Sequence, residues 1–175
     1  MYFVKILALS FLAAAQASCV VIPAAPGGIT SNAALVRRDD AIELVPRLPV
    51  ECGNGVSYDK KEIDRAFTKG KKMSKNGEQW SFGNNKFPKN YGSHDTDVFK
   101  NLPKECKDAV NAGSKLIEFP IKKPGPWTDG TQPGYDRVLM LRTEGNGQTR
   151  IDYCGVITHR GADGNFFKWC PHTKP

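Results

Sequence analysis

Three apolar segments lie in the second half of this 175-residue chain: KLIEFPI at 115–121, RVLMLR at 137–142 and IDYCGVITH at 151–159. Each segment is short, and the connections between them are rich in glycine and proline, a pattern typical of β-strands separated by loops. The tetrapeptide EGNG at 144–147 indicates a hairpin turn between the second and third segments. The three segments therefore predict three β-strands.

Polar residues interrupt these strands at positions where they can meet. Successive side chains on a strand point to opposite faces of a sheet, so Glu118 lies opposite to Ile117 and Phe119, and Arg137 lies opposite to Val138. Polar side chains that share one face of an antiparallel sheet can converge on a ligand. We therefore expect a binding site on the polar face of this sheet.

Upstream of the strands, residues 59–73 predict one amphipathic helix. Asp59 and Glu62 have the spacing of a capping box, and Ile63, Ala66 and Phe67 follow at helical intervals. Residues 79–82 alternate as a strand does, residues 83–106 are polar and indicate a loop, and residues 103–113 fit a second short helix. One helix followed by several strands predicts an α+β domain with an antiparallel sheet.

The first 49 residues differ in composition from the rest of the chain. Residues 1–17 combine Lys5, a short apolar run and an Ala-Gln-Ala site, which indicates a secretory signal peptide; the apolar run is too short for a transmembrane helix. Residues 18–49 are rich in proline and glycine and contain the dibasic pair Arg37-Arg38, which predicts a pro-segment or flexible arm. Residues 50–175 then form one domain of ordinary size.

Charge and cysteine content narrow the class of protein. The chain has 25 basic and 18 acidic residues; residues 1–38 hold three basic residues and no acidic one, so the remainder has a net charge of +4. This balance favours polyanionic partners only weakly. Cys19 falls beside the signal segment, and the even number of later cysteines in an exported chain indicates two disulfides, with three possible pairings: Cys52, Cys106, Cys154 and Cys170. A zinc site is disfavoured because no C-x-x-C spacing occurs.

Three motifs in this region resemble those of the fungal guanyl-preferring ribonucleases, a family that includes relatives of the sarcin ribotoxins. The motifs are EFPI at 118–121, PGYDRV at 133–138 and GVITHRGADGNFF at 155–167, in the order of that family. The third motif, followed by Cys170, is the most specific. The resemblance covers residues 52–170 and leaves the arm outside it. It implies a small, disulfide-bonded α+β domain with its helix packed on the sheet.

The resemblance also implies a catalytic apparatus. Glu118 would take a proton from the ribose 2′-hydroxyl, His159 would protonate the departing 5′-oxygen, and Arg137 would stabilise the charge on the phosphoryl oxygens. Phe167 matches the aromatic residue beside the phosphate. Because the nucleophile belongs to the substrate, we expect neither a metal nor a cofactor.

The segment FPKNY at 87–91 departs from the family's Tyr-Pro-His-x-Tyr run. Phe87 stands where the family has a tyrosine whose hydroxyl touches phosphate, so the resemblance implies a substrate contact there. Lys89 stands where the family has a histidine that assists the base, so the resemblance implies a catalytic position. Lys89 could hold Glu118 ionised, because an opposite charge lowers the pKa of a carboxyl group. Two alternatives are that Lys89 is a solvated surface lysine, or that it marks a protein in which the family's catalytic apparatus has changed.

Guanine recognition in the family implies further residues. Tyr91 would stack on the base, Asp95 would accept hydrogen bonds from its N1 and N2 groups, and Asn165 would close the other side of the base site. For the cysteines, the resemblance implies the pairs Cys52–Cys170 and Cys106–Cys154. The loop at 122–132 is short and only mildly basic, which favours a general ribonuclease over a ribosome-specific toxin.

The sequence thus predicts a secreted, extracellular endoribonuclease that cleaves single-stranded RNA, with a preference for guanine and a 2′,3′-cyclic phosphate product. We expect a monomer without a membrane partner. The alternative is a secreted effector on the same fold that grips RNA or a host protein without cutting it, because fold alone does not specify function.

Overall fold

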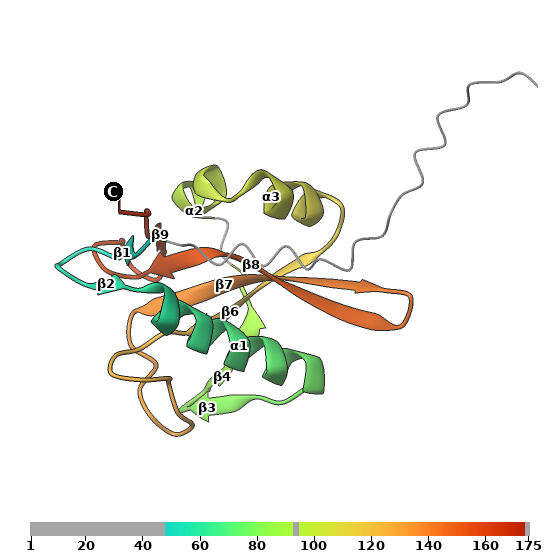
Figure 1. Ribbon diagram of the computed structural model, residues 1–175, viewed down its shortest axis with the longest axis horizontal. Coiled ribbons are helices and arrows are strands. Elements are labelled where there is room, and N and C mark those ends of the chain that lie inside the picture. The colour runs from blue at the N-terminus through green and yellow to red at the C-terminus, as the bar shows by residue number, and fades with distance from the viewer. Residues whose placement is uncertain (1–47, 93–94, 174–175) are drawn as a thin grey trace, which may run out of the picture. The chain divides into compact units, whose positions relative to one another are not determined.

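A five-stranded antiparallel sheet forms the centre of the computed structural model, which describes residues 48–92 and 95–173. The strands follow the spatial order β5-β6-β7-β8-β9 (Figure 1). Their bounds are β5 (Lys89–Asn90), β6 (Lys115–Pro120), β7 (Asp136–Gly145), β8 (Gln148–Thr158) and β9 (Lys168–Trp169). The three long strands match the three apolar segments and confirm the predicted antiparallel sheet.

The helix α1 (Lys60–Asn76) covers one face of this sheet (Figure 1). The side chain of Asp59 accepts a hydrogen bond from the backbone N–H of Glu62, and the side chain of Glu62 accepts one from the backbone N–H of Asp59, so the capping box is present. The helix ends at Asn76, three residues beyond the predicted end, and is followed by Gly77 in the left-handed conformation that suits glycine. Its apolar stripe packs against the sheet and buries Ile63, Phe67 and Met73 completely or nearly so.

Two shorter helices, α2 (Thr96–Asn101) and α3 (Lys104–Asn111), lie on the other side of the sheet (Figure 1). The helix α3 was expected, whereas α2 falls in the segment predicted to be a loop, so that prediction was wrong there. A six-residue helix carries little periodic signal, and α2 gains its stability from tertiary packing of Val98 and Leu102. The disulfide Cys106–Cys154 joins α3 to β8.

Four short strands complete the described chain. The strands β3 (Trp80–Phe82) and β4 (Asn85–Phe87) form a hairpin, and β3 agrees with the strand expected at 79–82. The strands β4 and β5 also lie in the segment predicted to be a loop. The pair β1 (Val50–Glu51) and β2 (Ser57–Tyr58) precedes α1, and the disulfide Cys52–Cys170 fastens it to the chain's last segment.

The fold class is the one predicted, a small disulfide-bonded α+β domain with its main helix on an antiparallel sheet. Both disulfides have the pairing that the resemblance implies. The expected signal peptide and most of the expected arm lie outside the described residues. Within residues 48–92 and 95–173, no helix has the length and apolar character needed to cross a membrane.

Candidate active site

A β-bulge decides which side chains meet on the sheet. Before it, Ile151 and Tyr153 of β8 pack against α1; after the register shift opposite Leu139 and Met140, Val156 packs there instead. The bulge inserts one residue and therefore reverses the alternation along β8. As a result, His159, the first residue after β8, follows Ile157 on the face turned away from α1.

Glu118 and Arg137 lie on this same face. Their neighbours two residues along each strand, Leu116 and Leu139, pack in the apolar cluster beside α2 and α3. Glu118, Arg137 and His159 all line one cavity of about 420 Å³. The remaining lining residues come mostly from β4, β5 and the loops that flank β7 and β9: Asn85, Lys89, Asn90, Tyr91, Gly92, Pro133, Asn165 and Phe167.

Glu118 is 2% exposed and sits between two cations. Its Oε1 lies 3.3 Å from Nζ of Lys89 and 4.0 Å from Nε of Arg137. Burial raises the pKa of the Glu118 carboxyl, and the charges of Arg137 and Lys89 oppose this rise. Its Oε2 is buried and has no hydrogen-bond partner among the described residues. This oxygen is therefore available to accept a hydrogen bond from a bound molecule.

Hydrogen bonds to backbone carbonyl oxygens fix the position of the Arg137 guanidinium. Its Nη1 donates to the carbonyl groups of Gly134 at 3.0 Å and Asp136 at 2.9 Å. Burial lowers the pKa of the Arg137 guanidinium, and the charge of Glu118 raises it. Its Nε is buried and donates no hydrogen bond within the described part of the chain, although it lies 4.0 Å from Oε1 of Glu118. Because buried donors are rarely left without a hydrogen bond, this N–H is available to an acceptor on a bound molecule.

His159 is oriented by the loop that precedes β9. Its Nδ1 lies 2.7 Å from the carbonyl oxygen of Phe166. Since a carbonyl can only accept, Nδ1 carries a hydrogen and Nε2 is left for the cavity. The ring stacks on Phe167 with centroids 3.6 Å apart. Burial lowers the pKa of the His159 imidazole, the hydrogen bond to Phe166 opposes this, and the charges of Arg137 and Lys89 lower it further.

Lys89 reaches the site by strand pairing. It is the direct partner of Glu118 between β5 and β6, so the two side chains share one face. Its Nζ also donates to Oδ1 of Asn85 at 3.4 Å. The structure thus brings Lys89 into contact with the carboxylate, which argues against an isolated surface lysine.

Phe87 does not line the cavity, although a substrate contact was expected from its position in the motif. Its side chain is 1% exposed and packs edge-on against Trp127. Its ring lies 5.1 Å from the Arg137 guanidinium carbon and 5.0 Å from Nζ of Lys89. Phe87 has no hydroxyl group and packs as a core residue. Its ring makes cation–π contacts with Arg137 and Lys89.

The predicted base site is only partly open. Tyr91 and Asn165 line the cavity, and Phe167 packs against Tyr91 with ring centroids 5.7 Å apart. Asp95 is 5% exposed and lies behind Tyr91 and Phe167. Its Oδ2 accepts bonds from the Tyr91 hydroxyl at 2.6 Å and the Phe167 backbone N–H at 3.1 Å. Asp95 is not among the residues that line the cavity, and its Oδ1 is buried with no hydrogen-bond partner among the described residues.

Sequence reasoning missed a polar cluster that supports Arg137 from the α1 side of β7. Asp136 is 1% exposed and accepts bonds from the Tyr58 hydroxyl at 2.7 Å, the Thr158 hydroxyl at 2.5 Å and the Arg160 guanidinium at 3.2 Å. It ties β2, β7 and β8 together beside the turn that holds Arg137. Asp136, Thr158 and Arg160 lie in the motifs at 133–138 and 155–167, whereas Tyr58 lies outside them. Because the motifs do not show which side chains meet across the strands, no local signal predicted the cluster.

Comparison with known proteins agrees with this geometry. The family described as ribonuclease matches residues 46–171. The chain belongs to this ribonuclease family. Guanyl-specific ribonuclease U1 of Ustilago sphaerogena is 29% identical over 70% of this chain and 95% of that relative. Guanyl-specific ribonuclease T1 of Aspergillus oryzae is 30% identical over 68% of this chain and 75% of that relative.

A third relative has a higher identity over a shorter part of the chain. Guanyl-specific ribonuclease F1 of Fusarium fujikuroi is 46% identical over 56 residues, which cover 32% of this chain and 37% of that relative. Membership of the ribonuclease family supports endoribonuclease activity with RNA as substrate. Within the described residues, no group of three or more His, Cys, Asp or Glu side chains is arranged to hold a metal ion.

Proposed function

We propose that this ribonuclease is a secreted endonuclease that cleaves single-stranded RNA after guanine and forms a 2′,3′-cyclic phosphate. One observation carries the proposal. A carboxylate with an unpaired oxygen, a guanidinium with an unpaired N–H and an imidazole with an available Nε2 line the same cavity. These are the base, the charge-stabilising group and the acid that phosphoryl transfer to an internal hydroxyl requires.

In the first step, Oε2 of Glu118 accepts the proton of the ribose 2′-hydroxyl. The 2′-oxygen forms a bond to phosphorus, the bond from phosphorus to the 5′-oxygen breaks, and Nε2 of His159 donates its proton to that oxygen. Arg137 stabilises the negative charge on the non-bridging oxygens. In the second step, His159 takes a proton from water as the water oxygen forms a bond to phosphorus. The bond from phosphorus to the 2′-oxygen breaks, Glu118 returns its proton to that oxygen, and a 3′-phosphate is left with both groups restored.

Guanine preference is the finer part of the proposal. At the cavity, Tyr91 offers a ring for stacking and Asn165 offers a polar contact to the base. The buried Oδ1 of Asp95, which has no hydrogen-bond partner among the described residues, would accept from the edge of a base that reaches it. The relatives named above are guanyl-specific. The signal-like segment at 1–17 and the two disulfides support secretion.

Product analysis tests the proposal directly. The purified, oxidised protein is incubated with four oligonucleotides that each contain one ribonucleotide, G, A, C or U, in an otherwise 2′-O-methyl strand. We expect cleavage after G at the highest rate, a 2′,3′-cyclic phosphate end, and the same rate in a chelator. A strand with 2′-deoxyguanosine at that position is the control and should stay intact. Absence of cyclic-phosphate product at every pH from 5 to 8 sinks the proposal.

The second candidate is an effector that binds RNA without cutting it. Two features favour it: Lys89 stands where the family has a histidine, and Oδ2 of Asp95 is already engaged within the protein. Retained RNA binding without product in the same assay would support this alternative.

A further inference from the structure

The positive charge of the domain is concentrated in one element. Residues 50–175 contain 21 basic and 15 acidic residues, and α1 alone contains seven basic and two acidic ones. The rest of the domain therefore has 14 basic and 13 acidic residues, a net charge of +1. Seven basic and two acidic residues give this 17-residue helix a net charge of +5, which favours a polyanionic partner.

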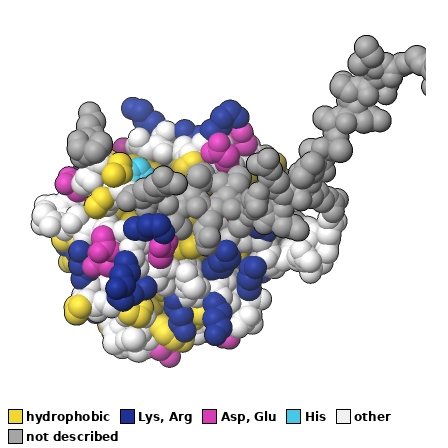
Figure 2. Space-filling view, viewed as in Figure 1, with side chains coloured by type: hydrophobic (Ala, Val, Ile, Leu, Met, Phe, Trp, Pro, Cys, Tyr) yellow, Lys and Arg dark blue, Asp and Glu magenta, His cyan; other side chains and the backbone are white. Residues whose placement is uncertain are grey.

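The cations lie on the solvent side of α1. The buried residues of the helix face the sheet, whereas Lys61, Arg65, Lys72 and Lys75 are exposed and have no ion-pair partner among the described residues. Figure 2 shows Lys and Arg side chains gathered over this part of the molecule. A shallow hollow of about 800 Å³ runs along the helix to Trp80 and Pro126.

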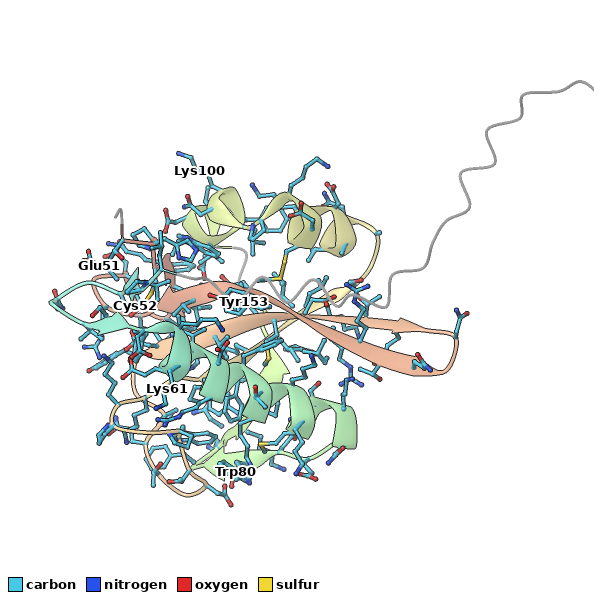
Figure 3. The ribbon with its side chains drawn as sticks, in the orientation of Figure 1. Glu51, Cys52, Lys61, Trp80, Lys100 and Tyr153 are labelled. Atoms are coloured by element: carbon cyan, nitrogen blue, oxygen red, sulfur yellow. A yellow bond between two sulfur atoms is a disulfide. The ribbon has the colours of Figure 1, made fainter. Side chains whose placement is uncertain are left out.

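This basic surface is separate from the catalytic cavity. The helix α1 packs on the face of the sheet that carries Ile117, Phe119 and Val138, and the cavity opens on the opposite face. Lys61 and Trp80 mark the α1 side in Figure 3, and Lys100 of α2 lies on the other side. An RNA segment in the cavity cannot contact both faces through the sheet.

The chemistry of the surface favours the phosphate backbone of folded RNA. Lys69 lies over the Trp80 ring, 3.9 Å from its centre, so this aromatic face is not free to stack on a base as single-strand binding proteins require. The apolar stripe of α1 is buried in the core, so the helix has no apolar face to insert into a membrane. What remains is a rigid row of cations along a helix about 25 Å long, which suits a rigid row of phosphates.

We propose that the exposed face of α1 is a second RNA-binding site, which holds the backbone of duplex regions without regard to sequence. It goes beyond the cleavage reaction and rests on the proposed function only for the choice of RNA among polyanions. The site increases the affinity for long, folded RNA and leaves the chemistry in the cavity unchanged.

The test compares two triple variants that each lose three exposed cations. The first removes charge from α1 (Lys61→Ala, Arg65→Ala, Lys72→Ala), and the matched control removes it elsewhere (Lys86→Ala, Lys100→Ala, Lys115→Ala). Binding to a fully 2′-O-methylated RNA duplex, which cannot be cleaved, is measured against salt concentration. Each lost phosphate contact reduces the slope of log K against log salt by about 0.7 to 0.9, so we expect the α1 variant to lose about two to three units of slope and the control to lose little.

Turnover of the dinucleoside phosphate GpC should be equal in both variants and the wild type, because so short a substrate reaches only the cavity. Equal slopes in the two variants would overturn the inference, as would α1-dependent binding to phosphatidylserine vesicles without binding to the duplex. The duplex assay needs no cleavage. Its outcome is therefore independent of whether the proposed ribonuclease reaction is observed.

Discussion

Glu118 is a buried carboxylate whose charge is set by opposing forces. Desolvation favours its neutral form, whereas Arg137 and Lys89 favour the charged form that a general base needs. His159 experiences the reverse, since burial and the same two cations disfavour the protonated form that a general acid needs. In the proposed mechanism, turnover requires that Glu118 has lost its proton and that His159 still holds one, which predicts a bell-shaped pH profile.

The strongest residue-level prediction concerns the proposed acid and base. Glu118→Gln and His159→Gln should each reduce kcat by about 10² or more, because each removes a proton-transfer group while preserving much of the side chain's shape. Single-turnover cleavage of a guanine-containing oligonucleotide measures the effect. Glu105→Gln and His172→Gln, at exposed positions, serve as controls and should retain full activity. Rates within about threefold of wild type in the Glu118 variant would exclude its role as base.

Lys89 has a pH signature that a merely structural residue lacks. Removing its charge in Lys89→Ala should raise the pKa of Glu118 and also raise the pKa of His159, because the cation lowers both. The acidic and basic limbs of the kcat profile should therefore both move to higher pH. Lys89→His should restore the wild-type acidic limb at pH values where the new imidazole is protonated. A profile that stays in place in Lys89→Ala would make this lysine a bystander.

At the level of elements, the approach of α1 to the sheet depends on Gly70. A Cβ atom at this position would lie 2.8 Å from Cε of Met140 and 2.9 Å from Cβ of Phe119. Gly70→Ala should therefore destabilise the protein by about 1 to 3 kcal/mol, although alanine is the better helix former by about 1 kcal/mol. Urea unfolding measures the change. Thr68→Ala, at an exposed position of the same helix, should change stability little; a stabilised Gly70→Ala protein would contradict the close packing.

At the level of the whole molecule, the disulfide Cys52–Cys170 joins segments 118 residues apart. In the chain-entropy description, closing so long a loop stabilises the native state by about 4 to 5 kcal/mol. The double variant Cys52→Ala, Cys170→Ala should lose most of that free energy of unfolding in urea. The corresponding variant of Cys106–Cys154, which closes a shorter loop, should lose slightly less. A loss below about 1 kcal/mol for the long bridge would mean that the unfolded chain is already compact.

The two faces of the sheet carry different surfaces. One face carries the cavity with Glu118, Arg137 and His159, and the other carries α1 with its row of exposed cations. Because the sheet separates them, changes on one face should act independently of changes on the other. Double variants that combine Glu118→Gln with the α1 substitutions should therefore show additive effects on cleavage and duplex binding.

Local sequence patterns were sufficient to predict the regular elements. The capping box and the spacing of Ile63, Ala66 and Phe67 predicted α1, because both signals act within a few residues. The apolar segments predicted β6, β7 and β8. The Asn146-Gly147 turn, in which both residues have positive φ, predicted the hairpin of β7 and β8. The motifs in these segments also predicted the family to which the chain belongs, and they contain the three polar residues Glu118, Arg137 and His159 that line the cavity.

Tertiary structure decided where those residues point and how they behave. Simple alternation along β8 would place His159 on the α1 face with Ile151 and Tyr153; the bulge reverses it, and a one-residue shift has no clear signal in the sequence. The burial of Phe87, the ion pair of Lys89 with Glu118 and the contacts of Asp95 likewise depend on partners distant in the chain. Because desolvation and charge act through space, the pKa shifts of the site arise only when the strands are assembled.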